Sequence, residues 1–155
     1  CNSARVIVNG ETWGIYTNVE TLDDEFVESR FGKPIGNLWD TSNDKYHVDL
    51  VPENQRYFER ETMGVPADGG DLSKLLQTLA GPENRFMEDA AKVLELDEWL
   101  LVAGVQAMLA DWDGFYGATN NYEIYSKPST GRFVLLPWGQ DQTFGKRDEE
   151  TVSSD

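Results

Sequence analysis

The chain has very little cysteine and histidine. Its 155 residues include one cysteine, Cys1, and one histidine, His47. A single cysteine excludes a disulfide within the chain and leaves the redox compartment open. Zinc sites combine several His and Cys side chains, so a lone histidine gives no support to one. Since His47 alternates with Tyr46 and Val48 in the run YHVDLV, we expect a surface strand residue, not a catalytic one.

Basic residues are also few. Lysine and arginine number 13 against 28 aspartates and glutamates, and the net charge is −15 at pH 7. Nucleic acids are therefore not expected as partners, because binding their phosphate backbone needs a basic face. A strongly acidic surface suits a soluble extracellular protein or a salt-rich habitat.

Long apolar runs and several common motifs are missing. No run of apolar residues is long enough to span a membrane, and no signal peptide is visible, so an export signal would lie upstream or have been removed. No P-loop, nucleophile elbow or dinucleotide fingerprint is present. The 12% aromatic content, with five tryptophans, argues against disorder. The length suits one domain with a core.

The first sixty residues predict short strands, turns and one helix. Asn9-Gly10 lies between two alternating stretches and is a strong signal for a hairpin turn. A helix capped by Asp23 or Asp24 is expected to run to Phe31. The expected strands are residues 4–9, 11–20, 35–40, 46–51 and 56–61.

Three helices are expected in the middle of the chain. They cover residues 71–81, 82–96 and 97–112, with Asp71 and Asp97 as caps and Pro82 in a first turn. The first two carry apolar residues on one face, which is typical of helices that cover a core. The third is apolar nearly all round, and this predicts that it lies buried at the centre of the domain.

The stretch from Asp111 to Gly145 predicts a β-hairpin between two polar loops. The strands NYEIYS and RFVLLPW are joined by the turn KPSTG. A tight turn brings the outer ends of both strands together, so Asp113 and Asn121 would face Asp141. Carboxylate and amide oxygens are the ligands that hard divalent cations prefer. This arrangement therefore predicts a site for a metal ion with a nucleotide phosphate.

The same stretch resembles the CotH family, the spore-coat-protein-H type of atypical protein kinases. The resemblance lies in DWDGF, NNYEIY and PWGQDQTFG, and it extends upstream to VNGETWGIYTNVE and GNLWD in the same order. It implies an α+β, atypical protein-kinase-like fold with an N-terminal β-hairpin, central buried helices and a catalytic-loop β-hairpin. The family's domain is longer than this chain, so we expect residues 1–155 to be a single kinase-like domain truncated at both ends.

The resemblance also implies an activity. Members of the family would move the γ-phosphate of ATP, with Mg or Mn, to Ser or Thr of a protein on the cell surface or coat. The chain would then be extracellular or in the cell envelope. The implied roles are catalysis for Asp113, metal binding for Asn121 and Asp141, and nucleotide contact for Trp138, Glu20 and Asn120.

Two departures from the family pattern favour an alternative, a catalytically inactive surface binding or adhesion module. Asp40 stands where the family has lysine, and Gly139 stands where it has the first acid of the second loop. Simpler interpretations also exist for the site residues. Asp113 is a common turn residue before glycine, Glu20 fits a solvated strand end, and Trp138 fits a core aromatic that follows a buried strand.

Overall fold

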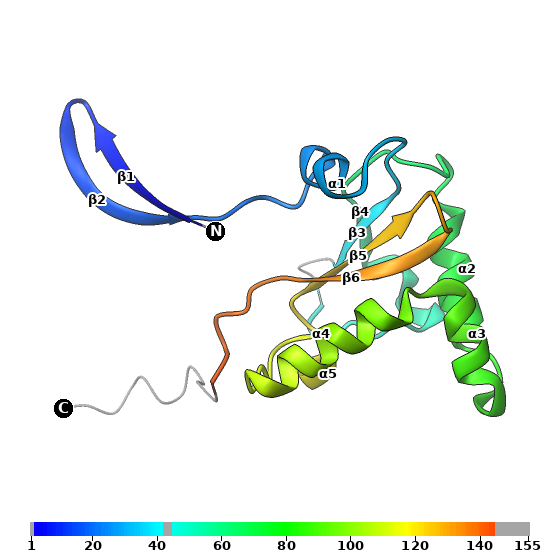
Figure 1. Ribbon diagram of the computed structural model, residues 1–155. Helices are drawn as coiled ribbons and strands as arrows, with labels where there is room; N and C mark the ends of the chain where they lie inside the picture. The colour runs from blue at the N-terminus through cyan, green and yellow to red at the C-terminus, as the bar shows by residue number, and fades with distance from the viewer. Residues whose placement is uncertain (1, 42–44, 145–155) are drawn as a thin grey trace.

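A computed structural model of the chain, which describes residues 2–41 and 45–144, combines two antiparallel β-sheets with several helices (Figure 1). This agrees with the predicted α+β class. The first sheet pairs β1 (Asn2–Val8) with β2 (Glu11–Asn18). The second sheet has the strand order β4-β3-β5-β6. Its strands are β3 (Leu38–Thr41), β4 (Phe58–Arg60), β5 (Tyr122–Lys127) and β6 (Arg132–Pro137).

The β1–β2 hairpin stands apart from the rest of the fold (Figure 1). Its turn is Asn9-Gly10, and both residues have positive φ, 52° and 86°, as a tight hairpin turn requires. The predicted hairpin is therefore confirmed. The expectation that Glu20 ends the second strand is wrong, because β2 stops at Asn18.

Helix α1 (Asp24–Phe31) follows the hairpin and matches its prediction. The carboxylate of Asp23 accepts a hydrogen bond from the backbone N of Phe26 at 2.9 Å, so Asp23 is the N-cap. Gly32 ends the helix at a φ of 78°, where a residue with a Cβ would be strained. Val27 is the buried residue of α1 and packs on one face of the larger sheet.

The larger sheet packs on both faces because its side chains alternate. Leu38, Tyr125 and Val134 form a core with α1 on one face. Trp39 and Ile124 point to the other face, where they join the main core with residues of the central helices. Figure 1 shows α1 on one side of this sheet and α4 on the other.

The segment before β4 differs from its prediction. Residues 46–51 form no strand, and His47 has a φ of 60°. A left-handed residue breaks the alternation that a strand needs. A 3₁₀ helix, η1 (Pro52–Tyr57), then leads into β4, which confirms the strand expected near residues 56–61.

The three central helices exist, but their starts are shifted. They are α2 (Gly70–Leu79), α3 (Phe86–Val93) and α4 (Leu96–Met108), with a 3₁₀ turn η2 (Glu83–Arg85) before α3 and a short helix α5 (Phe115–Ala118) after α4. Asp71 and Asp97 lie in first turns and are not caps. The Asp71 carboxylate accepts instead from Asn37 Nδ2 at 3.1 Å.

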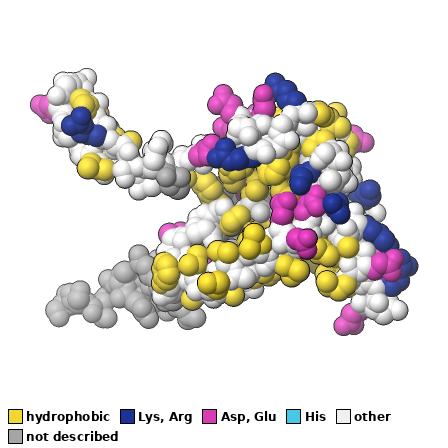
Figure 2. Space-filling model, viewed as in Figure 1, with side chains coloured by type: hydrophobic (Ala, Val, Ile, Leu, Met, Phe, Trp, Pro, Cys, Tyr) yellow, Lys and Arg dark blue, Asp and Glu magenta, His cyan; other side chains and the backbone are white. Residues whose placement is uncertain are grey.

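The predicted burial of α4 is wrong. Only Trp99 and Gln106 are buried in this helix. Leu101 is 68% exposed and Met108 is 86% exposed, and Figure 2 shows hydrophobic side chains gathered along α4. A helix that is apolar on every side does not specify which side meets the core. Among the described residues, no helix is long and apolar enough to cross a membrane.

Candidate functional site

The β5–β6 hairpin brings two polar loops together. Tyr122 at the start of β5 pairs with Pro137 at the end of β6. One residue further out, the backbone N of Trp138 donates to the carbonyl oxygen of Asn121 at 2.9 Å. The loop that ends at Asn121 and the loop that begins at Trp138 therefore lie side by side, as the hairpin signal predicts.

Asp113 is the centre of the first loop. Asn120 Nδ2 donates to one of its carboxylate oxygens at 3.1 Å, and Asn121 Nδ2 donates to the other at 2.7 Å. The structure thus brings together three of the predicted site residues. Because Asn121 turns its amide nitrogen to Asp113, its Oδ1 is left facing Gly139, where an added Cβ would lie 3.2 Å away.

Asp111 stabilises the same loop through hydrogen bonds to its backbone. Its side chain is buried, and burial raises the pKa of its carboxyl group. The carboxylate accepts hydrogen bonds from the backbone amides of Asp113 and Gly114 and from Gln106 Nε2, the last at 2.9 Å. A Cβ at Gly114 would lie 2.4 Å from Asp111 Oδ2, so only glycine fits above this group.

Gln106 is a residue that sequence reasoning missed. It is buried on α4, and its Nε2 lies 3.4 Å from Gln140 Oε1 in the second loop as well as 2.9 Å from Asp111. Gln106 therefore touches both loops. A signal was present in the sequence, because Gln106 is the one polar side chain between Trp99 and Met108.

His47 also supports the first loop, in a way that no sequence pattern announced. Its Nδ1 lies within hydrogen-bond distance of the carbonyl oxygen of Ala118, at the end of α5. The Tyr122 hydroxyl donates to the carbonyl oxygen of Val48, which follows His47 in the chain. These two bonds fasten residues 47–48 to the loop and to the start of β5.

A polar pocket of about 250 Å³ opens where the loops meet β3. Trp138 lines it and is 42% exposed, so the interpretation as a core aromatic is wrong. The pocket is lined by Asp40, Thr41, Lys45, Tyr46, Asn120, Asn121, Tyr122 and Trp138. Its lining therefore holds one cationic group, one carboxylate, two amides and three aromatic residues.

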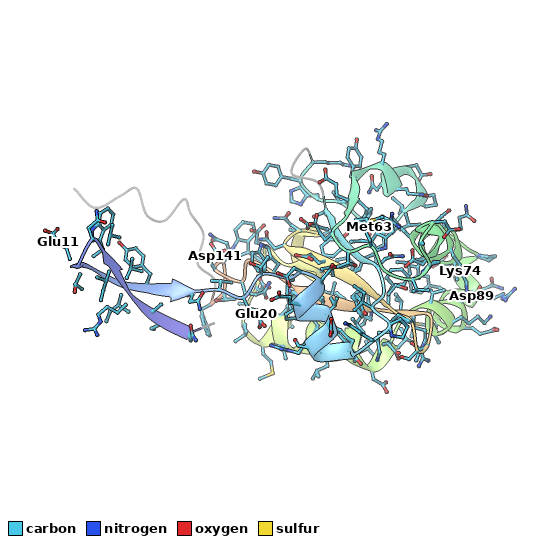
Figure 3. All side chains as sticks on the ribbon, turned by 90° about the horizontal axis from the view of Figure 1, so that it is seen from above. Glu11, Glu20, Met63, Lys74, Asp89 and Asp141 are labelled. Carbon is cyan, nitrogen blue, oxygen red and sulfur yellow. The ribbon has the colours of Figure 1, made fainter. Side chains whose placement is uncertain are left out.

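Three predicted site residues lie outside this lining: Asp113, Glu20 and Asp141. The Glu20 carboxylate forms an ion pair with Arg30 at 2.8 Å. Asp141 is exposed, and its carboxylate accepts a hydrogen bond from Gln142 Nε2 at 3.1 Å. Figure 3 shows Asp141 at the end of the molecule nearest the β1–β2 hairpin, with Lys74 and Asp89 at the opposite end. Their roles remain predictions.

Backbone strain is concentrated in the two loops. Ala110, Thr119, Asn121 and Phe144 all have φ between 47° and 57°, the left-handed region that residues other than glycine rarely adopt. Such residues persist only where the surrounding structure fixes them, and they cluster at functional sites. The strain therefore agrees with a functional use of this loop pair.

Gly139 belongs to the same strained region. Its φ is 55°, and a Cβ there would meet Asn121 at 3.2 Å. An aspartate at this position would be strained and would crowd Asn121. Gly139 therefore removes one carboxylate from the loop and fits a backbone conformation that glycine adopts without strain.

The oxygen donors of the loops suit a hard divalent cation. They are the carboxylates of Asp113 and Asp141 and the Oδ1 of Asn121. Within the described residues, no three Asp, Glu, His or Cys side chains are close enough together to hold a metal ion. Magnesium commonly uses one or two carboxylates and takes its remaining ligands from phosphate and water. The donor types, two carboxylates and one amide oxygen, are ones that a magnesium ion accepts.

The fold and the pocket together define a mixed α and β domain whose candidate site lies beside two polar loops at the end of a hairpin. The profile of the family described as CotH kinase protein matches residues 1–155, and the chain belongs to this family. The resemblance drawn from the motifs is thereby confirmed. Inner spore coat protein H of Bacillus subtilis (strain 168) is 26% identical over 151 residues, which are 92% of this chain and 41% of that protein. The chain therefore spans less than half the length of this relative.

Proposed function

We propose that this chain belongs to a kinase-like phosphotransferase that moves the γ-phosphate of ATP, with Mg or Mn, to Ser or Thr of a coat or envelope protein. The observation that carries the proposal is the Trp138–Asn121 backbone bond, because it joins the two acidic loops at one pocket. The family supports it, and so does the name of the relative, an inner spore coat protein.

The proposed chemistry is positioning and charge neutralisation. Asp113, held by two asparagine amides, would orient the acceptor hydroxyl and accept its proton. Asn121 Oδ1 and Asp141 would hold the metal ion, which neutralises charge on the phosphates when it is bound. Trp138 would stack on the base. Lys45 is the cation of the pocket, although its Nζ already donates to Asn54 Oδ1 at 2.7 Å.

A second candidate function is a catalytically inactive surface binding module. Two observations favour it. Gly139 supplies no carboxylate and its backbone disfavours one. Asp40 lines the pocket where a phosphate would approach, and like charges repel. Both candidates keep the chain at a coat or envelope, and they differ in turnover of ATP.

Phosphate transfer separates the two candidates. The chain is incubated with γ-labelled ATP, Mn²⁺ and dephosphorylated casein, beside Asp113→Ala and the matched control Glu83→Ala, which removes an exposed acid elsewhere. We expect label in casein with the chain and with Glu83→Ala, and a loss of about 10²-fold or more with Asp113→Ala, the range of general acid–base contributions. Equal labelling by all three proteins, or by none, would remove the kinase proposal.

A further inference from the structure

Three acidic side chains form a row across the larger sheet. Asp40 on β3 is directly opposite Glu59 on β4 and Glu123 on β5. Directly opposite residues project from the same face, and neighbouring strands lie about 4.8 Å apart. Like charges in this position destabilise a sheet. A positive charge bound near these three carboxylates would therefore stabilise the sheet.

Glu123 is the most confined member of the row. Its side chain is 7% exposed, and its Oε2 is buried without a hydrogen-bond partner. Leu136 lies opposite it on β6 and offers no polar group. Burial raises the pKa of Glu123 to about 8, and the charges of Asp40 and Glu61 add to the rise. A buried carboxyl group with no hydrogen-bond donor either keeps a proton or, once it is ionised, binds a cation.

The basic residues nearby in the chain are engaged elsewhere. Lys45 Nζ donates to Asn54 and lies 4.5 Å from the centre of the Tyr57 ring. Arg60 follows Glu59 on β4, so it projects from the other face, and it donates to the carbonyl oxygen of Ala67. Within the described part of the chain, no ion pair reaches the row.

We propose that Asp40 and Glu123 form a binding site for a hard divalent cation, separate from the Asp113–Asn121–Asp141 donors. Calcium is the better fit, because it accepts flexible sets of oxygen ligands and tolerates several waters. No three acidic side chains converge among the described residues, so two carboxylates and water make up the site. Such a site is weak, with a Kd on the order of 0.1–1 mM.

The site has a consequence for the pocket. Asp40 also lines the pocket between the loops. A cation on Asp40 would offset the negative charge that meets an incoming phosphate. This consequence rests on the proposed function, whereas binding of the cation does not.

Calorimetric titration with CaCl₂ at constant ionic strength and pH 8.5, without nucleotide, tests the site. We expect saturable binding of one Ca²⁺ by the chain, and Kd at least about tenfold weaker in Glu123→Gln and Asp40→Asn, since the loss of a group at a metal site costs at least that much. Glu123→Gln keeps the side-chain shape and removes a buried charge, so we expect it to fold, and its unfolding temperature is checked first.

Two matched variants complete the test. Glu83→Gln removes an exposed acid that is not part of the row, and Asp141→Asn removes a donor of the other site. Both are expected to bind Ca²⁺ as the unchanged chain does. Non-saturable binding that is equal in all proteins, or binding that is lost with Asp141→Asn and kept with Glu123→Gln, would overturn the proposal. Because no nucleotide is present, failure here leaves the phosphate-transfer experiment unaffected.

Discussion

Gly114→Ala is expected to lower the free energy of unfolding by about 1–3 kcal/mol, the usual cost of overpacking. The added Cβ would lie 2.3 Å from Gln106 Nε2 and 2.4 Å from Asp111 Oδ2, so both buried side chains would have to move. These side chains fix the backbone beside Asp113 and reach the second loop through Gln140. We therefore also expect loss of any phosphate transfer. Urea unfolding, followed by tryptophan fluorescence, measures the change.

Gly104→Ala is the matched control. Gly104 lies inside α4 with nothing within 4 Å of an added Cβ. Alanine there should raise the free energy of unfolding by roughly 0.5–1 kcal/mol, because glycine weakens a helix interior. Opposite signs for the two glycines are the expected outcome. If Gly114→Ala proved as stable as the unchanged chain, the packing of Gln106 and Asp111 described above would be wrong.

Leu75→Ala is expected to lower the free energy of unfolding by about 2–5 kcal/mol, as for other fully buried leucines. Leu75 on α2 is 0% exposed and belongs to the main core. The matched variant Leu101→Ala should change stability by no more than about 0.5 kcal/mol, because this side chain on α4 is 68% exposed. For a chain of this size, thermal unfolding should shift by roughly 2–4 °C per kcal/mol.

This pair of leucines tests the exposure of α4 directly. A cost of several kcal/mol for Leu101→Ala would mean that the helix is buried in solution, as the sequence predicts. Near equality of the two variants would contradict the division between core and surface found here.

The parts of the fold set by local chemistry were predictable. Asn9-Gly10 fixes the first hairpin, because both residues tolerate positive φ. Asp23 and Gly32 mark the two ends of α1 by capping, which depends only on neighbouring residues. The hairpin of β5 and β6 follows from its turn and its β-branched and aromatic strands.

What depends on distant partners was not predictable. The side chains of α4 are apolar nearly all round, so the pattern could not say which side meets the sheet. His47 sits in a strand-like run, yet its partner is a carbonyl oxygen 71 residues away. Asp71, which is expected to cap α2, bonds instead to Asn37 from an earlier segment.

The candidate site also has a part that neighbouring residues specify and a part that depends on distant ones. The meeting of Asp113, Asn120 and Asn121 follows from their closeness in one loop. The link through Gln106 joins three segments, and a sequence motif confined to one segment could not reveal it. The acidic row of the larger sheet depends on the register of β3 with its neighbours, which no pattern in the strands specifies.

The proposed function requires that the two loops form one site for a nucleotide and a metal ion. Paramagnetic broadening by Mn²⁺ with ATP, compared with Mn²⁺ alone, tests it most directly in an NMR spectrum of the labelled chain. We expect that adding ATP makes the amide signals of Asp113, Asn121 and Asp141 lose intensity together and before those of α2 and α3. Broadening of only one loop, or no change on adding ATP, would contradict it.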